Sequence, residues 1–353
     1  MNHPVTAVIP REFKFWEGDQ ELTEEQMIGQ YEAGAAGVWK DPEATREFEE
    51  LIVGSGGSLD GGQICTDNGL YGAGEGRLVI PFVFVLQLLP GCWPGAAQQR
   101  GDCVSHSTKN AALTTLCCDV VSAKPDEETG KVEGLPDIDP IGVTQGALST
   151  EAIYWYRGYN GDGWSCEAAA TVAIKKSALW PRKAYPELGI DLTRYSGSLA
   201  GKYGRAAPPE SITSTGQKHL IRTATRISTF AQVRDMLANG YGITTCGSEG
   251  FSSTRDENGV SRRKGSWSHA LSFIGADDRP EIIKLYGEPL VLVLNSWAKW
   301  NSGPRRIYGT TIDIPEGSFW ARWSDVSRRS MLAFSGANGW PAKTLPPFDL
   351  VVG

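Results

Sequence analysis

One cysteine in this sequence stands where a reactive thiol would be placed. Cys103, in the stretch QQRGDCVSHST, comes directly before a run with helical spacing, so we expect it to open a helix. A thiol at a helix N-terminus ionises more readily, because the helix dipole and the free N–H groups of the first turn stabilise the thiolate. Cys103 is therefore a candidate nucleophile, and Asp102 is expected to cap the helix through its carboxylate.

A nucleophilic thiol needs a base, and the base needs a group that orients it. His269, in SHALSFIGA, begins an apolar stretch that predicts a strand, and Asn295, in LVLVLNSW, ends the next one. Pairing of these strands through residues 277–289 would bring Asn295 near His269. Asn295 could then accept a hydrogen bond from the imidazole and fix its tautomer, with Trp297 shielding that bond from water.

Each of these residues taken alone is more often structural than catalytic. A single cysteine is usually a small buried hydrophobic residue, and an asparagine at a strand end is usually a turn residue. The ordered set of Cys103, His269 and Asn295, each in its local context, is what favours catalysis. His106 lies one helical turn after Cys103 and is interpreted as structural, because a base has to approach the thiol from across a cleft.

The elements around these residues predict an α+β fold. A helical half, about residues 101–181, precedes a strand-rich half, about residues 225–335, and a cleft between the halves is expected. Glycine-dense residues 54–76 read as a long loop or linker. The individual expectations are helices at 23–33, 41–53 and 104–123, two helices within 149–181 joined by a bend at 158–163, a helix and then a strand within 228–248, and strands at 78–89 and from 265 onward.

Composition excludes several functional classes. The net charge of −7 and the absence of a dense basic run argue against a nucleic-acid partner, and the basic triplet at 262–264 is interpreted as a solvated loop. The longest apolar run, residues 78–90, is too short for a membrane-spanning helix. The N-terminus lacks the basic and then apolar pattern of a signal peptide.

Cysteine and histidine usage gives two further expectations. Seven cysteines without a paired framework, two of them adjacent at Cys117 and Cys118, predict a mostly reduced, intracellular type of chain with at least one free thiol. The four histidines are scattered and have no zinc spacing, so neither a metal nor another cofactor is expected.

The stretches GDCVSHS, SHALSFIGA and LNSW resemble the three signature stretches of papain-like cysteine peptidases, and the resemblance extends over about residues 78–330. It implies a papain-like fold, with a central helix that carries the cysteine, and hydrolysis of peptide bonds in peptides or proteins through an acyl-enzyme. By this resemblance Cys103 would be the nucleophile and His269 its base and later the acid. Asn295 would orient His269, and Trp297 would shield that contact.

The resemblance also indicates a substrate groove and an oxyanion donor. The glycine-rich bend at Gly161, Asp162, Gly163 and Trp164 resembles the family's groove-lining stretch. The family's oxyanion glutamine lies six residues before the cysteine, where this chain has Ala97, so Gln98 and Gln99 are both candidates. Two more positions depart from the family pattern: Val104 replaces a tryptophan, and Arg100 replaces a cysteine that commonly forms a disulfide.

Residues 1–76 are expected to form a helical arm with a glycine-rich linker, which in such a family would be a prosegment or a permanent docking arm. Residues 77–353 would be the papain-like domain, with a Pro/Gly-rich tail. The alternatives are a catalytically silent papain-fold protein in a larger assembly such as a virion, which the arm and the tail would contact, and a cell-wall amide hydrolase. A divergent bacterial or phage-type member would fit the low overall similarity.

Overall fold

The computed structural model describes residues 26, 37–123, 134–176, 178–205, 208–213 and 220–346. Within these ranges the α+β class expected from the sequence is confirmed. The helices are α2 (Pro42–Gly54), α3 (Gly61–Asp67), α4 (Phe82–Leu88), α5 (Cys103–Ser122), α6 (Pro140–Thr144), α7 (Glu151–Tyr154), α8 (Cys166–Lys175), α9 (Gly197–Arg205), α10 (Glu210–Thr213), α11 (Phe230–Ala238), α12 (Pro280–Tyr286) and α13 (Trp323–Val326), with a 3₁₀ turn at Pro186–Leu188. The strands are β1 (Leu78–Val79), β2 (Ala184–Tyr185), β3 (Ile190–Asp191), β4 (Ala224–Ile227), β5 (Ile243–Arg255), β6 (Ser261–Asp277), β7 (Leu290–Leu294), β8 (Ser318–Arg322) and β9 (Ser330–Phe334).

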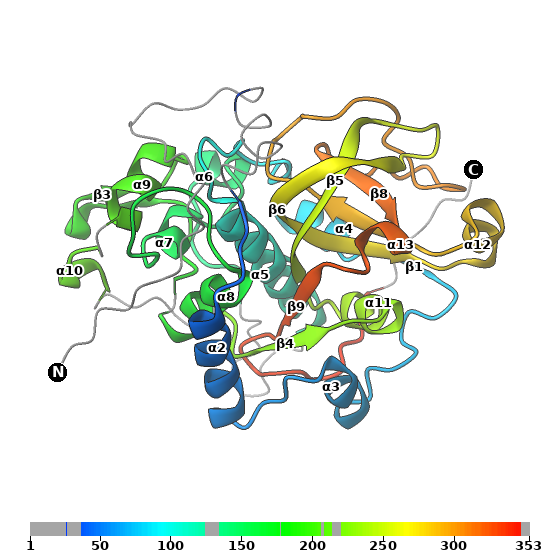
Figure 1. Cartoon of the computed structure of the whole chain (residues 1–353), viewed down its shortest axis with the longest axis horizontal. Coiled ribbons are helices and arrows are strands. Elements are labelled where there is room, and N and C mark those ends of the chain that lie inside the picture. The colour runs from blue at the N-terminus through cyan, green and yellow to red at the C-terminus, as the bar shows by residue number, and fades with distance from the viewer. Residues whose placement is uncertain are drawn as a thin grey trace.

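A helical half and a sheet lie side by side, and the long helix α5 runs between them (Figure 1). Helices α6 to α10 form the half at the left of that view. The sheet has the order β4-β9-β5-β6-β7-β8, with β1 added to β6, and every pairing in it is antiparallel. A second, two-stranded sheet joins β2 to β3.

Helix α5 is buried on all sides over its first four turns, from Cys103 to Cys118. Its residues are small or apolar on the faces that meet the sheet, so the helix can lie close to the strands. Two of its buried polar side chains are hydrogen-bonded to backbone carbonyls: the Ser107 hydroxyl bonds to the Leu271 carbonyl oxygen at 2.5 Å, and the Lys109 ammonium donates to the Gly146 carbonyl at 3.0 Å. Buried polar groups without such partners would destabilise the fold.

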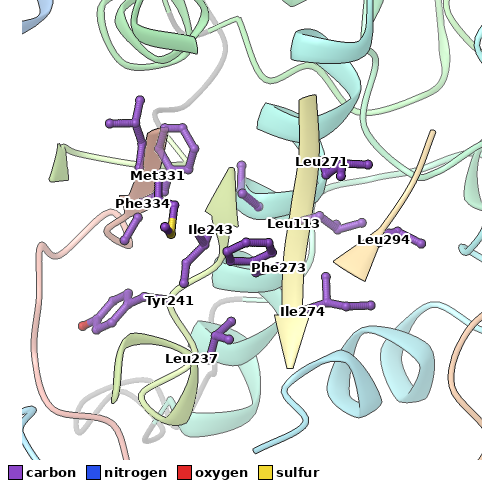
Figure 2. Close-up of a cluster of buried hydrophobic side chains, with 14 of the residues drawn as sticks. Leu113, Leu237, Tyr241, Ile243, Leu271, Phe273, Ile274, Leu294, Met331 and Phe334 are labelled. Atoms are coloured by element: carbon purple, nitrogen blue, oxygen red, sulfur yellow. The ribbon is translucent and has the colours of Figure 1, made fainter. Parts of the chain in front are cut away.

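The main hydrophobic core joins α5 and α11 to the sheet (Figure 2). Leu113 of α5 and Leu237 of α11 meet Phe273 of β6, Ile243 of β5 and Phe334 of β9, and all five side chains are buried. Full burial of a side chain of this size contributes about 1.5–3 kcal/mol. The core therefore fixes the position of α5 relative to β6, and these two elements carry Cys103 and His269.

The helix expected at 41–53 is present as α2 (Pro42–Gly54). Asp41 caps it as expected, with its carboxylate accepting hydrogen bonds from two N–H groups of the first turn. Phe48 and Ile52 are fully buried, and the helix packs against α8. The helix expected at 23–33 lies outside the described residues, apart from one helical position at Gln26.

Three secondary-structure expectations were wrong. The basic triplet at 262–264 was expected in a solvated loop but lies in strand β6, with its side chains exposed. The apolar run 78–89 is mostly the helix α4, preceded by the short strand β1. Residues 82–85 are all apolar and buried, so this first part of α4 gives no periodicity that could distinguish helix from strand. Residues 54–76 include the helix α3, and the Asp235 carboxylate of α11 accepts hydrogen bonds from Gly72 and Gly74 in this segment.

Most of the cysteines are reduced, as expected, but Cys166 and Cys246 form a disulfide that the sequence did not predict, with a Cα–Cα distance of 6.2 Å. The two cysteines are 80 residues apart, and the fold brings the start of α8 against β5, a contact that the spacing of the cysteines did not indicate. The remaining five cysteines are buried and form no disulfide, so the expectation of at least one thiol outside a disulfide is confirmed.

The tail packs onto the body over its described part, which ends at residue 346. Trp340 contacts the Tyr241 ring edge-on at 4.8 Å between centroids, and Lys343 forms an ion pair with Asp119 of α5 at 2.7 Å. Within the described ranges, none of the helices combines the length and the apolar character needed to cross a bilayer.

Candidate active site

Cys103 is the first residue of α5, as expected, and its side chain is buried. It therefore lies in the first turn of a 20-residue helix, where backbone N–H groups have no partner within the helix and the helix dipole favours negative charge. One turn further on, Ser107 bonds to Leu271, two residues beyond His269 on β6. The start of α5 thus lies against the part of β6 that carries His269.

His269 and Asn295 are brought together by the pairing of β6 with β7, in which Ser272 lies opposite Leu294. The distance from His269 Nε2 to Asn295 Oδ1 is 2.8 Å. Asn295 Oδ1 also accepts the Ser296 N–H at 2.7 Å, and this second bond identifies the atom facing His269 as an oxygen. His269 Nε2 must therefore carry the proton, so in the neutral ring Nδ1 is the basic nitrogen.

Tryptophans exclude water from this hydrogen bond. The Trp297 ring stacks on His269, with centroids 4.6 Å apart and an angle of 25° between the planes. Trp267 and Trp300 pack edge-on against Trp297, at 4.8 and 5.6 Å. Burial lowers the pKa of His269 to about 3, against the smaller opposing effect of its bond to Asn295. The ring is accordingly neutral at physiological pH in this state.

Arg329, just before β9, is a charged residue that the sequence did not single out. Its side chain is fully buried, and one of its amino groups donates to the backbone carbonyl of His269. It interacts electrostatically with both Cys103 and His269. The sequence signal was weak, because Arg329 follows another arginine in a stretch that reads as an exposed turn.

The two oxyanion candidates point to different places. Gln98 is buried beside Asn295: its backbone N–H and its side-chain oxygen both bond to Ser296, and its side-chain nitrogen donates to the Arg100 carbonyl at 2.6 Å. The Gln99 side-chain oxygen instead accepts the Gly197 N–H of α9 at 3.1 Å. Only Gln98 is held next to the loop that carries Asn295.

Asp102 occupies the N-cap position, but its carboxylate does not cap the helix, which corrects the expectation. The carboxylate accepts a hydrogen bond from the Tyr195 hydroxyl at 2.9 Å instead. The Asp102 backbone, with ψ at 24°, lies outside the extended region that lets an N-cap side chain turn back onto the first turn. Tyr195 belongs to a segment far along the chain, which local sequence patterns do not connect to α5.

His106 lies beside Asp102 and Tyr195. Its Nε2 is 3.6 Å from Asp102 Oδ1, and its ring meets Tyr195 edge-on at 5.1 Å. Burial raises the pKa of Asp102 to about 8 and holds the pKa of His106 well below its ordinary value. The proton therefore resides on the carboxyl at neutral pH, and no ion pair forms between the two residues.

The bend at 161–164 lies across from β6, and residues 37–39 lie between them. Asp162 forms a buried ion pair with Arg100 at 2.7 Å, and Gly163 N–H donates to the Gly101 carbonyl at 2.8 Å, which attaches the bend to the segment before Cys103. Figure 1 shows the chain leading into α2 running between the helical half and the sheet.

Residues 37–39 are hydrogen-bonded on both sides. On one side Trp164 N–H donates to Gly37 O at 2.8 Å, and Trp39 N–H donates to Trp164 O at 3.3 Å. On the other, Val38 N–H bonds to Ser268 Oγ at 3.0 Å, and Ser268 Oγ donates to Val38 O at 2.6 Å. The segment fits closely: a Cβ at Gly37 would lie 1.5 Å from Ser268 O, next to His269.

The Cys166–Cys246 disulfide connects the same two sides. Cys166 follows Trp164 by two residues, and Cys246 pairs across the β5–β6 ladder with Ala270, the residue after His269. The bend and the histidine-bearing strand are thus joined covalently close to where residues 37–39 lie.

No known family profile matches this sequence, and no curated protein sequence matches it. Solved structures similar to the chain include xylellain, a cysteine protease from Xylella fastidiosa, with 14% identity and a TM-score of 0.39 over 72% of this chain and 88% of the other. A recombinant stem bromelain precursor has 14% identity and a TM-score of 0.39, covering 88% and 97% of the two chains. Procathepsin B from Trypanosoma congolense has 11% identity and a TM-score of 0.40, covering 85% and 82%. Identities and TM-scores this low assign no activity to this chain, so its function has to be inferred from the geometry of its own residues.

Proposed function

We propose that the chain is a papain-like cysteine peptidase that hydrolyses peptide bonds through an acyl-enzyme on Cys103. The observation that carries the proposal is the hydrogen bond between His269 and Asn295. Asn295 Oδ1 also accepts the Ser296 N–H, which identifies it as the acceptor and leaves Nδ1 as the basic nitrogen of the ring. This pair lies against the N-terminus of the helix that Cys103 opens. A thiol at a helix N-terminus, a base of defined tautomer and an orienting amide are the parts that thiol-dependent acyl transfer needs.

The reaction would proceed in two steps. His269 takes the thiol proton of Cys103, and the sulfur adds to the substrate carbonyl carbon. The C–N bond then breaks, and the leaving amine takes the proton from His269. Water, deprotonated by the same ring, attacks the thioester and releases the acid, and the proton returns to the thiol. Asn295 keeps the ring in place throughout, and Trp297 keeps water from the bond that orients it.

Developing negative charge on the carbonyl oxygen requires donors that are already in position. The backbone N–H of Cys103, in the first turn of α5, is one candidate. Of the two glutamines, Gln98 is the better second donor, because it lies beside Asn295 and Ser296 whereas Gln99 bonds to α9.

In this proposal residues 37–39 occupy the substrate groove, whose walls are Gly161–Trp164 and the start of the His269 segment. Hydrogen bonds from both walls to the same three residues support this assignment. The described chain would then be a resting form, with the site dry and His269 neutral. Residues 37–39, the part of the arm in the groove, would have to leave it, by cleavage or by movement, before substrate enters.

The experiment is covalent labelling of the thiol combined with release of the arm. In the variant Gly37→Ala the added Cβ collides with Ser268 O, so the arm should be displaced and labelling of Cys103 by a thiol-directed epoxide should accelerate at least tenfold. The matched control is Gly54→Ala, because no heavy atom lies within 4 Å of a Cβ built there. Labelling is located by mass spectrometry, and peptide hydrolysis is followed in parallel.

Cys103→Ala in the Gly37→Ala background should abolish both labelling and hydrolysis, whereas Cys92→Ala, which removes another buried free thiol, should leave both intact. Hydrolysis that persists without Cys103 would contradict the proposal. Labelling of Cys103 without hydrolysis of any peptide would favour the second candidate, a silent papain-fold protein whose groove is permanently filled by its own arm. The seating of residues 37–39 is the observation that keeps this candidate open.

A further inference from the structure

Arg329 is a buried cation bonded to three neighbouring residues. Its side chain has no exposed surface. Besides the carbonyl of His269, it bonds to the Thr245 hydroxyl at 3.2 Å and to Glu249, through both the backbone carbonyl and the carboxylate at 3.3 Å. Burial of a guanidinium carries a large desolvation cost, which these bonds offset.

The fold makes room for this side chain beside the histidine. Gly247 pairs directly with His269 across the β5–β6 ladder, and a Cβ at Gly247 would lie 2.7 Å from Arg329 Cγ and 3.1 Å from Cζ. A Cβ there would also lie 2.6 Å from Glu249 Oε2, so any other residue at position 247 would force the Glu249 carboxylate or the Arg329 side chain to shift. The glycine, the arginine and the histidine therefore form one packed unit.

We propose that Arg329 is a positioning residue for the thiol chemistry: it holds the main chain of His269 and places a fixed positive charge beside Cys103 and His269. The inference rests on the proposed function, since it assigns Arg329 to that same site. The positive charge favours the Cys103 thiolate and disfavours the imidazolium, so it moves the ionisation of both groups toward lower pH.

Among the ionisable groups around the site, Arg329 is a cation that acts on both Cys103 and His269. A second buried cation, Arg100, precedes Cys103 by three residues and is paired with Asp162. From α5, Asp102 is protonated at neutral pH because burial raises its pKa to about 8, and the buried His106 is neutral. From β5, Glu249 lies against Arg329 and partly offsets its charge. Burial lowers the pKa of Arg329 to about 10, which leaves it charged throughout the neutral range.

The test is the pH profile of kcat/KM for peptide hydrolysis in the arm-released Gly37→Ala chain. Arg329→Met should move the acidic and the alkaline limbs together toward higher pH, by on the order of one unit for a charge at this range. Glu249→Gln should move both limbs toward lower pH, because it removes the charge that offsets Arg329. Arg329→Lys should restore the wild-type limbs. Arg328→Met, which removes the neighbouring exposed arginine, should leave them unchanged.

A second readout does not need hydrolysis. The ultraviolet absorbance of the Cys103 thiolate, taken as the difference between the full-length chain and its Cys103→Ser variant, gives the pH at which the thiolate forms. Of the other free thiols, burial raises the pKa of Cys65 and Cys92 to about 11, that of Cys118 to about 12 and that of Cys117 well above its ordinary value. They therefore do not interfere at lower pH.

Opposite shifts for Arg329→Met and Glu249→Gln, in either readout, would support the inference. Unshifted profiles in folded variants, or shifts of the same sign in both, would overturn it and make Arg329 a purely structural residue. If Arg329→Met fails to fold, the pH profiles of Arg329→Lys and Glu249→Gln decide the question. If no peptide is hydrolysed at all, the proposed function fails while the thiolate measurement still tests Arg329.

Discussion

Two buried histidines lie near the start of α5, and their surroundings differ. His269 donates to an amide oxygen that cannot take the proton, so its second nitrogen stays basic. His106 lies 3.6 Å from a carboxyl that keeps its own proton in the buried setting. An amide orients an imidazole without competing for its proton, whereas the Asp102 carboxyl, bonded to Tyr195, forms a neutral polar cluster. Proximity to the thiol along the sequence therefore does not select the base.

Replacing each histidine in turn should give the largest difference in kcat between the two positions. We expect His269→Ala to lower kcat at least 10³-fold in the arm-released chain, as loss of a nucleophile's base does in such systems. His106→Gln should change kcat by no more than a few fold but should cost about 1–3 kcal/mol of stability, the cost of disturbing a buried polar group. Steady-state kinetics and thermal unfolding of both variants test this, and a large kcat loss in His106→Gln would reverse the assignment.

Removing the orienting amide of Asn295 should lower kcat by less than the loss of His269 does. Asn295→Ala breaks a hydrogen bond that gains strength when His269 becomes charged, worth about 1.5–3 kcal/mol, so kcat should fall about ten- to hundredfold. Asn295→Asp places a carboxylate where the amide was, and its negative charge stabilises the imidazolium of His269, so the alkaline limb of the pH profile should move to higher pH. The pH dependence of kcat in both variants measures this, and an unchanged Asn295→Ala profile would contradict the orienting role.

Asp102→Asn should have the smallest effect on catalysis, because the wild-type carboxyl is already neutral. Its consequence should appear in stability. A folded-state pKa of about 8, above that of the unfolded chain, means that the native state keeps a proton which the unfolded state has lost. Stability should therefore fall as pH rises toward 8, and Asp102→Asn should flatten this slope.

The slope is best measured by denaturant unfolding between about pH 6.5 and 8. Unperturbed histidines of the unfolded chain also lose their charge in this range, so the slope of the wild type is compared with that of Asp102→Asn. An equal slope in the wild type and Asp102→Asn would show that Asp102 is ionised in the native state. The cluster around His106 would then be an ion pair, and the contrast between the two histidines would be weaker.

Local patterns predicted much of this arrangement. The helix after Cys103, the strands around His269 and Asn295, and the Asp41 cap are set by periodicity and by capping within a few residues. The contact of Asn295 with His269 followed from the pairing of consecutive strands. The run at 78–89 could not be assigned, because four consecutive residues, 82–85, are apolar and buried and so give no periodicity.

The features that the sequence did not reveal come from distant segments. Tyr195 takes the Asp102 carboxylate away from the helix N-terminus, Arg329 reaches His269 past a glycine, and Cys166 finds Cys246 across the fold. None of these contacts leaves a local pattern. Division of the chain near residue 76 stays a prediction, as do partners of the arm and of the tail.

The attachment of residues 37–39 to the same chain has a kinetic consequence. A segment tethered this closely meets its binding site at an effective concentration in the millimolar range, whereas enzymes commonly have KM values between about 1 μM and 1 mM. An external peptide would therefore compete poorly for as long as the tether is intact. On this view the rate of peptide hydrolysis is governed first by the fraction of chains whose arm has left, and the apparent KM of the intact chain reports the strength of its own intramolecular competitor.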